Sequence, residues 1–147
     1  MAEAGEFDII VQGCNCFNAM GGGIAKEIAM RYPNVAEVDA QTIRGDYDKL
    51  GNYTKATAVV PGKTPFVIIN AYTQYSTSRG EDVFEYVAFE LILQKLAAKY
   101  GPLRFGFPYI GMGLAKGDSK KILWKLRGFD MEIEQHGGSV TLVEFEK

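Results

Sequence analysis

The residues with the richest chemistry lie in one stretch, QGCNCFNAMGGGIAKEIAMRYP, which runs from Gln12 to Pro33. It brings together thiols, side-chain amides and three consecutive glycines. Thiols can bind metals or act as nucleophiles, amides suit sugar hydroxyls, and glycines let a ligand approach the backbone closely. The surrounding sequence decides which of these chemistries it supports.

Cys14 and Cys16 lack the partners that metal or thiol chemistry needs. A structural zinc site requires a full set of nitrogen or sulfur ligands, and His136 is the chain's only histidine. His136 lies in EQHGG near the predicted end of the last helix, where the helix dipole favours a histidine just ahead of Gly137. We therefore expect no metal and no cofactor, and we interpret both cysteines as small, buried, reduced side chains.

Two glycine-rich loops could bind an anion through backbone amides. Each precedes a predicted helix, and the amides that open a helix point at whatever lies beyond its N-terminus. Together the loops could hold a diphosphate from two sides, although tight turns and close packing would explain each loop taken alone. The candidate residues are Gly21, Gly22, Gly23 and Ile24 in the first loop, and Ile110, Gly111, Met112, Gly113 and Leu114 in the second.

Polar and aromatic residues that follow predicted strands extend the candidate site. Asn15 and Asn18 could each contact a ligand or cap their own loop. Capping is the stronger explanation for Asn18, whereas Asn15 lies closer to the end of the first strand and is expected to contact the ligand. Asp118 is a candidate general base, and its alternative role is to cap the next helix. The remaining candidates are Tyr72, Thr73 and Gln74, which could simply end a strand, and Phe145, which could stack on a base or belong to the core.

The elements that must position these residues alternate between strands and helices. Apolar runs predict strands, and helical spacing of apolar residues predicts helices. This order indicates an α/β class with a mixed sheet between helical layers, and ligands of such sheets bind beyond the carboxyl ends of the strands. The expected strands are residues 7–11, 54–60, 66–71, 104–108 and 140–145, with 54–60 and 66–71 antiparallel; the expected helices are 23–32, 34–43, 81–100 and 119–135.

Composition and charge limit the possible partners. A chain of 147 residues that is 47% apolar is expected to form a single domain over residues 1–147. Its 16 basic and 18 acidic residues give a net charge of −2, which supplies no field to attract nucleic acid or an anionic membrane. Neither a membrane-spanning run nor a signal-peptide pattern is visible, so we expect a cytoplasmic protein.

The segments DIIVQGCNCFNAMGGGIAKEIAMRYP, VIINAYTQY and FPYIGMGLAKGD together resemble the macro domain family, which binds ADP-ribose. The likeness covers nearly the whole chain. It is greatest to the branch with phage and bacterial proteins named for ADP-ribose 1''-phosphate processing and the human-type hydrolase of ADP-ribosyl-glutamate. The resemblance implies a three-layer α/β/α sandwich in which the two glycine loops bracket the diphosphate and distal ribose, and Asn15 contacts that ribose near its reactive carbon.

Three departures from the family pattern bear on activity. Relatives that cleave ADP-ribose from glutamate or DNA carry a lysine where this chain has Gln74, and the human-type enzyme has an acid where this chain has Ala115. Family members usually begin with one more strand and a G-[DN]-[IL] motif that helps to hold adenine, whereas this chain begins MAEAGEF. We therefore expect a shortened macro domain that lacks the first strand, and an exposed sheet edge that could support a homo-oligomer.

The resemblance and the residues together predict an ADP-ribose-binding protein. The expected reaction is metal-independent hydrolysis of ADP-ribose 1''-phosphate, with Asn15 positioning the ribose or a water and Asp118 as general base. Turnover is expected to be slow, because no strong nucleophile is visible. Two alternatives stay open: a non-catalytic reader of ADP-ribose, and a glycohydrolase acting on ADP-ribosylated protein or nucleic acid, against which Gln74 and Ala115 count.

Overall fold

The computed structural model describes residues 5–20, 23–76, 83–108 and 118–143. Strands and helices alternate along these residues, as the apolar patterns predicted. In order they are β1 (Ile9–Cys14), α1 (Gly23–Arg31), α2 (Pro33–Ala40), the short 3-10 helix η2 (Tyr47–Lys49), β2 (Tyr53–Ala58), β3 (Phe66–Tyr72), α3 (Tyr86–Tyr100), β4 (Arg104–Pro108), α4 (Ser119–Gln135) and β5 (Ser139–Val143).

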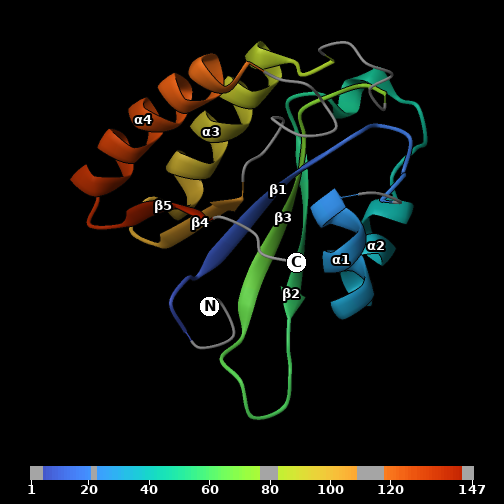
Figure 1. Cartoon of the computed structure of the whole chain (residues 1–147), viewed down its shortest axis with the longest axis horizontal. Helices are drawn as coiled ribbons and strands as arrows, with labels where there is room; N and C mark the ends of the chain where they lie inside the picture. Colours follow the sequence, from blue (N-terminus) through green and yellow to red (C-terminus); the bar gives the residue numbers. More distant parts are fainter. Residues whose placement is uncertain (1–4, 21–22, 77–82, 109–117, 144–147) are drawn as a thin grey trace.

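The strands form one mixed sheet in the order β2-β3-β1-β4-β5 (Figure 1). Strand β1 lies in the middle and pairs in parallel with β3 and β4, and β4 pairs in parallel with β5. Strand β2 pairs antiparallel with β3, which confirms the expected orientation of these two neighbours. The predicted mixed sheet is therefore confirmed.

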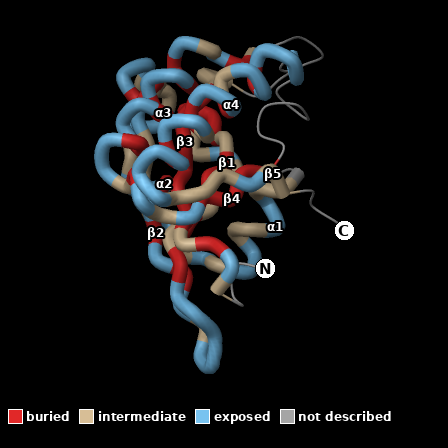
Figure 2. Tube along the Cα trace, turned by 90° about the vertical axis from the view of Figure 1, so that its left-hand side faces the viewer, coloured by how far each residue is buried: buried red, intermediate tan, exposed pale blue. Residues whose placement is uncertain are grey.

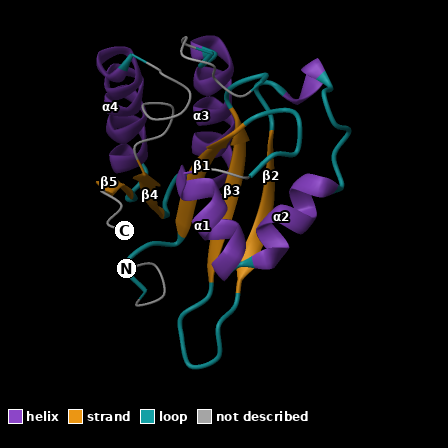
Figure 3. Ribbon diagram, turned by 45° about the vertical axis from the view of Figure 1, so that its right-hand side comes forward, coloured by secondary structure: helices purple, strands orange, loops and turns teal. Residues whose placement is uncertain are grey.

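Helices cover both faces of the sheet, giving three layers. Helices α1 and α2 lie on one face and α3 and α4 on the other (Figures 1 and 3). Successive side chains of a strand point to opposite faces, so β1 sends Ile9 and Val11 into the core beneath α3 and α4, and Ile10 into the core beneath α1 and α2. Strand β3 begins with a continuous apolar run because both of its faces are buried. The exposed turn of residues 61–65 projects from the far end of the sheet (Figure 2).

Helix α3 begins later than the sequence pattern predicted. The expected start was residue 81, but residues 83–85 are not helical and the helix begins at Tyr86. Phe84 instead forms an isolated bridge with Gln74 and packs its ring against Tyr86 and Phe89. The Glu85 amide donates to the Thr73 carbonyl at 2.6 Å. Tertiary pairing with the end of β3 has therefore replaced the first turn of the predicted helix.

The topology brings the described candidate residues that follow β1 and β3 to one edge of the sheet. The carboxyl ends of β1, β3, β4 and β5 all point to this edge because the four strands are parallel. Since β2 runs the other way, its first residue lies at the same edge, where Tyr53 pairs with Ala71. The segment of residues 41–52, which leads from α2 into β2, therefore also reaches this edge. We call it the 41–52 segment.

Strand β2 forms an outer edge of the sheet. The Asn34 amide of α2 donates to the Thr57 carbonyl on this strand at 2.8 Å, and Lys55 is exposed on it. Residues 5–8, the described part before β1, contain no strand. Association of two copies through a sheet edge stays a prediction.

Candidate functional site

Asn15 follows β1 directly and shapes the loop that leads to the glycines. Its side chain is only 7% exposed. The Asn15 Oδ1 accepts hydrogen bonds from the amides of Phe17 and Ala19 at 2.9 and 3.4 Å, and its Nδ2 donates to the Ala19 carbonyl at 2.9 Å. The carboxamide thus closes a turn within its own loop, which is the local bonding that asparagine favours.

Asn18 connects this loop to the 41–52 segment. Its φ of +57° places it in the left-handed region, which asparagine tolerates better than most residues. Its Nδ2 donates to the Thr42 carbonyl at 3.2 Å, and its Oδ1 accepts from the Thr42 hydroxyl at 3.1 Å and from Lys49 Nζ at 2.6 Å. Both asparagine side chains are therefore engaged within the protein and fix the path of the described residues that follow β1.

The residues after β3 are tied to the same loop. The Thr73 amide donates to the Cys14 carbonyl at 3.2 Å, and the Cys16 amide donates to the Tyr75 carbonyl at 2.9 Å. Thr73 is buried, and Gln74 is half-buried with its Nε2 donating to the Ser76 carbonyl at 2.8 Å. The loops that follow β1 and β3 thus form one bonded unit.

The 41–52 segment, which sequence analysis did not single out, completes this unit. The Gly45 amide donates to the Cys16 carbonyl at 2.6 Å, and the Tyr75 hydroxyl donates to the Gly45 carbonyl at 2.7 Å. The ring of Tyr47, which is 65% exposed, stacks on Tyr75 with centroids 3.7 Å apart, while Phe17 packs edge-on against Tyr75 at 4.8 Å. Only the Gly45 turn signal hints at this segment in the sequence, because its partners lie far away along the chain.

A buried polar network lies beneath the loops, between the sheet and α2. The Gln12 Nε2 donates to Asn70 Oδ1 at 2.8 Å, and the Asn70 Nδ2 donates to Thr54 Oγ1 at 3.1 Å. The Thr54 hydroxyl lies 3.0 Å from the Tyr72 hydroxyl, which donates to Asp39 Oδ1 at 2.7 Å. Burial raises the pKa of Tyr72, and the hydrogen bond to Asp39 also raises it. The predicted ligand residue Tyr72 thus directs its side chain into this network.

Neither cysteine offers a reactive thiol. Cys14 and Cys16 are both buried and unbridged. Burial is the largest influence on each and raises the pKa of both thiols. Among the residues that the structure describes, no group of three or more metal-binding side chains is placed to hold an ion. Within the same residues, no helix is long and apolar enough to cross a membrane.

Asp118 caps α4. Its Oδ1 accepts from the amides of Lys120 and Lys121 at 2.9 and 3.4 Å, and its own amide donates to the Tyr86 hydroxyl at 2.8 Å. Gly23 and Ile24 open α1, as expected from the helical pattern. The other predicted site residues lie outside the described ranges: Gly21, Gly22, Ile110, Gly111, Met112, Gly113, Leu114 and Phe145.

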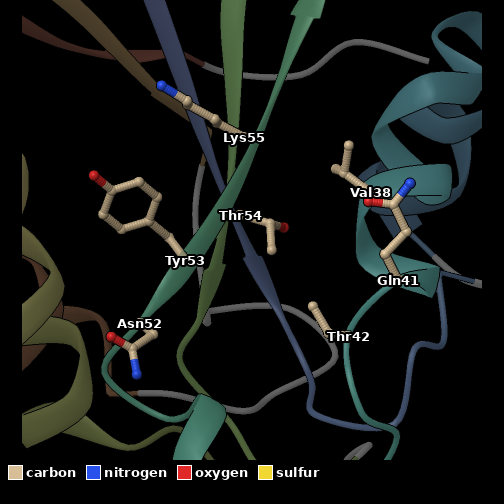
Figure 4. A pocket seen from close by; sticks show the side chains of 7 residues that line it. All are labelled: Val38, Gln41, Thr42, Asn52, Tyr53, Thr54 and Lys55. Atoms are coloured by element: carbon tan, nitrogen blue, oxygen red, sulfur yellow. The ribbon is translucent and has the colours of Figure 1, made fainter.

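An open cavity of about 580 Å³ lies beside the network, between the end of α2 and the start of β2 (Figure 4). The side chain of Thr54 faces Val38 and Gln41 across this space. Tyr53 lies on the opposite side of β2 (Figure 4). Thr42 and Thr54 both line the cavity and also hydrogen-bond to residues of the site. Of the predicted ligand-binding residues that the structure describes, none lines this cavity.

Solved structures share this fold. The chain matches the macrodomain of Mycobacterium tuberculosis DarG with a TM-score of 0.70 and 17% identity, covering 92% of this chain and 89% of that one. It matches a Trypanosoma brucei macrodomain in complex with ADP-ribose with a TM-score of 0.65 and 18% identity, over 96% and 59% of the two chains. It also matches Thermosipho africanus DarTG in complex with ADP-ribose, with a TM-score of 0.74 and 13% identity, over 95% and 38%.

The chain therefore has the macrodomain fold. No model of a known family matches the sequence itself. At the level of sequence, the chain belongs to one family with an uncharacterized 17.5 kDa protein of Enterobacteria phage T4 from the tk-vs intergenic region. The two are 32% identical over 143 residues, which is 93% of this chain and 86% of the phage protein.

Proposed function

We propose that this protein binds ADP-ribose at the carboxyl edge of its sheet. The observation that carries the proposal is the bonded unit there: Asn15 shapes the loop after β1, and the Cys16 amide fastens that loop to Tyr75 after β3. A loop held in this way leads directly into α1, whose first amides can receive phosphate oxygens. Two solved structures that share the fold contain ADP-ribose, which supports the same ligand here.

The reaction that we propose for this site is hydrolysis of ADP-ribose 1''-phosphate without a metal. The first loop and the chain after β4 would hold the ligand, with Asn15 fixing the geometry around the distal ribose and Asp118 as the general base. Asn15 acts through the loop that it shapes, since its carboxamide is engaged there. Asp118 is exposed, and its Oδ1 is engaged by the first amides of α4, so turnover would be slow and would depend mainly on positioning.

A second candidate function is that of a non-catalytic reader of ADP-ribose. It is favoured by the hydrogen bonds just described, because the two groups expected to act in catalysis both have structural partners. A glycohydrolase of ADP-ribosylated protein or nucleic acid is less favoured, since Gln74 stands where such relatives carry lysine and is held by Ser76.

Two measurements on the full chain separate these functions. Calorimetry with ADP-ribose and with AMP tests binding, and we expect AMP to bind at least about tenfold more weakly because it lacks the distal ribose and one phosphate. Phosphate release from ADP-ribose 1''-phosphate tests turnover. Absence of ADP-ribose binding would refute the proposed function, whereas binding with release no faster than in buffer would favour the reader.

Asp118→Asn sharpens the test of turnover. Asparagine is also a good N-cap, so α4 keeps its cap and the melting temperature should change little. A general base at this position would be lost, and phosphate release should then fall by at least about a hundredfold. Exposed Asp48→Asn in η2 serves as the matched control. Equal rates for the two variants would remove Asp118 from the mechanism.

A further inference from the structure

Lys49 is a buried cation with an unusual set of partners. Its side chain belongs to the 41–52 segment, and the residue is only 8% exposed. Nζ donates to the Cys16 carbonyl at 2.9 Å and to Asn18 Oδ1 at 2.6 Å, and it lies 5.0 Å from the centre of the Tyr72 ring. Both hydrogen-bond acceptors are in the loop that leads from β1 to the glycines.

No carboxylate in the described part of the chain pairs with this ammonium group. The ion pairs there are Asp8 with Arg104 and Glu90 with Lys125. Asp39, a buried carboxyl of the same region, accepts from the Tyr72 hydroxyl. A buried charge without a counter-ion costs free energy, and neutral acceptors compensate only part of that cost. An anion bound at the adjoining loop would supply the missing charge.

We propose that Lys49 is the charged positioning residue of the anion site. It holds Cys16 and Asn18 in the conformation that directs the loop towards α1, and its positive charge stabilises the phosphates of the ligand through that loop. The inference rests on the proposed function for the identity of the ligand. It goes further in assigning the charge of the site to a residue outside the glycine loops.

The structure provides matched variants that separate charge from shape. Lys49→Met keeps the length of the apolar stem and removes the charge, and Lys49→Gln also removes the charge but keeps a donor. Lys49→Arg keeps the charge. Thr42→Val removes a neutral donor to the same Asn18 Oδ1, together with the bond of the Thr42 hydroxyl to the Asp39 carbonyl, and so reports the cost of loosening neutral contacts around Asn18.

The experiment measures the affinity of each full-length variant for ADP-ribose by calorimetry at two salt concentrations. It also measures the rise in melting temperature with inorganic pyrophosphate. We expect Lys49→Met and Lys49→Gln to lose at least about tenfold in ADP-ribose affinity, with the wild type, Lys49→Arg and Thr42→Val within about threefold of one another. The uncharged variants should depend less on salt and should not be stabilised by pyrophosphate.

Each outcome decides between the two proposals. Suppose that the uncharged variants and Thr42→Val lose ADP-ribose affinity to the same extent, with unchanged salt dependence. The proposed role of the Lys49 charge is then wrong, and Lys49 has a structural role only. A third result is that the wild type does not bind ADP-ribose, while pyrophosphate raises the melting temperature only of the proteins with a charged residue 49. In that case the role of Lys49 stands and the proposed function fails. If all variants bind ADP-ribose and pyrophosphate equally, only the role of Lys49 fails. A wild type that responds to neither ligand overturns both.

Discussion

The Tyr72 hydroxyl donates a hydrogen bond of 2.7 Å to Asp39, joining the end of β3 to α2 beneath the site. Tyr72→Phe removes this hydroxyl, so the buried Asp39 Oδ1 loses the hydrogen bond that it accepts from Tyr72. The free energy of unfolding should fall by about 2 kcal/mol, as measured by urea denaturation. Tyr47→Phe is the control, because the ring of Tyr47 is exposed and the stack on Tyr75 survives. A Tyr72→Phe protein as stable as this control would show that the bond contributes nothing.

Asn15 should affect both stability and binding, because its side chain shapes the loop that leads to the glycines. Asn15→Ala removes the hydrogen bonds to Phe17 and Ala19, so the free energy of unfolding should fall by about 1–2 kcal/mol. ADP-ribose affinity should fall at least about tenfold. The control is Asn34→Ala, which removes a bond to Thr57 away from the site and should spare affinity. Equal affinities of the two variants would contradict the role given to Asn15.

The ion pair of Asp8 with Arg104 should make stability depend on pH in the acid range. Hydrogen bonds from Arg104 hold the pKa of Asp8 below its ordinary value of 3.8. A carboxyl group whose pKa is lower in the folded than in the unfolded protein stabilises the fold at any pH above its unfolded-state pKa. This stabilisation is lost as the pH falls through its folded-state pKa. Asp8→Asn should therefore have a lower melting temperature than the wild type near neutral pH, and the difference should shrink below about pH 4.

Exposed Glu37→Gln on α2 is the control for that pH series. Its difference from the wild type should show no comparable change in the acid range. A difference between Asp8→Asn and the wild type that stayed constant down to pH 2, or grew, would show that the ion pair does not stabilise the folded protein.

The thiols should be inert in the folded protein. Burial raises the pKa of Cys14 and Cys16, so little thiolate exists near pH 8. Alkylation by iodoacetamide, followed by mass spectrometry, should be at least about tenfold slower in the native protein than in urea. Rapid labelling of native Cys16 would show that the loop opens or that its thiol is activated.

Much of the fold follows from local patterns. The apolar run of β4 and the helical pattern of α4 predicted Arg104–Pro108 and Ser119–Gln135 with the bounds that the structure has. Both elements have clear ends, since Asp118 caps α4 and Gly137 follows it in the left-handed region. The start of α3 was wrong because the bridge from Phe84 to Gln74 depends on a strand that a local window does not contain.

The site was predicted less completely, because several of its contacts join residues that lie far apart along the chain. Sequence patterns indicated Asn15 and the glycines, but they could not show that the Asn15 carboxamide would bond within its own loop. Lys49 was missed because its partner Asn18 lies 31 residues away along the chain, and the fold alone brings the two together. Asp118 as a cap was foreseen, since the side chain lies next to the amides that it receives.

The central position of β1 has a consequence for how the chain is made. The strand that carries the first loop is synthesised before β4, which is one of its two neighbours, and the bonds between Asp8 and Arg104 span 96 residues. Until β4 is synthesised, the backbone N–H and C=O groups on that edge of β1 have no strand to pair with. Contacts so far apart slow folding, and they leave apolar surface open to aggregation in the meantime. The sheet edge that carries the proposed site is therefore complete only after β4 has been synthesised and has paired with β1.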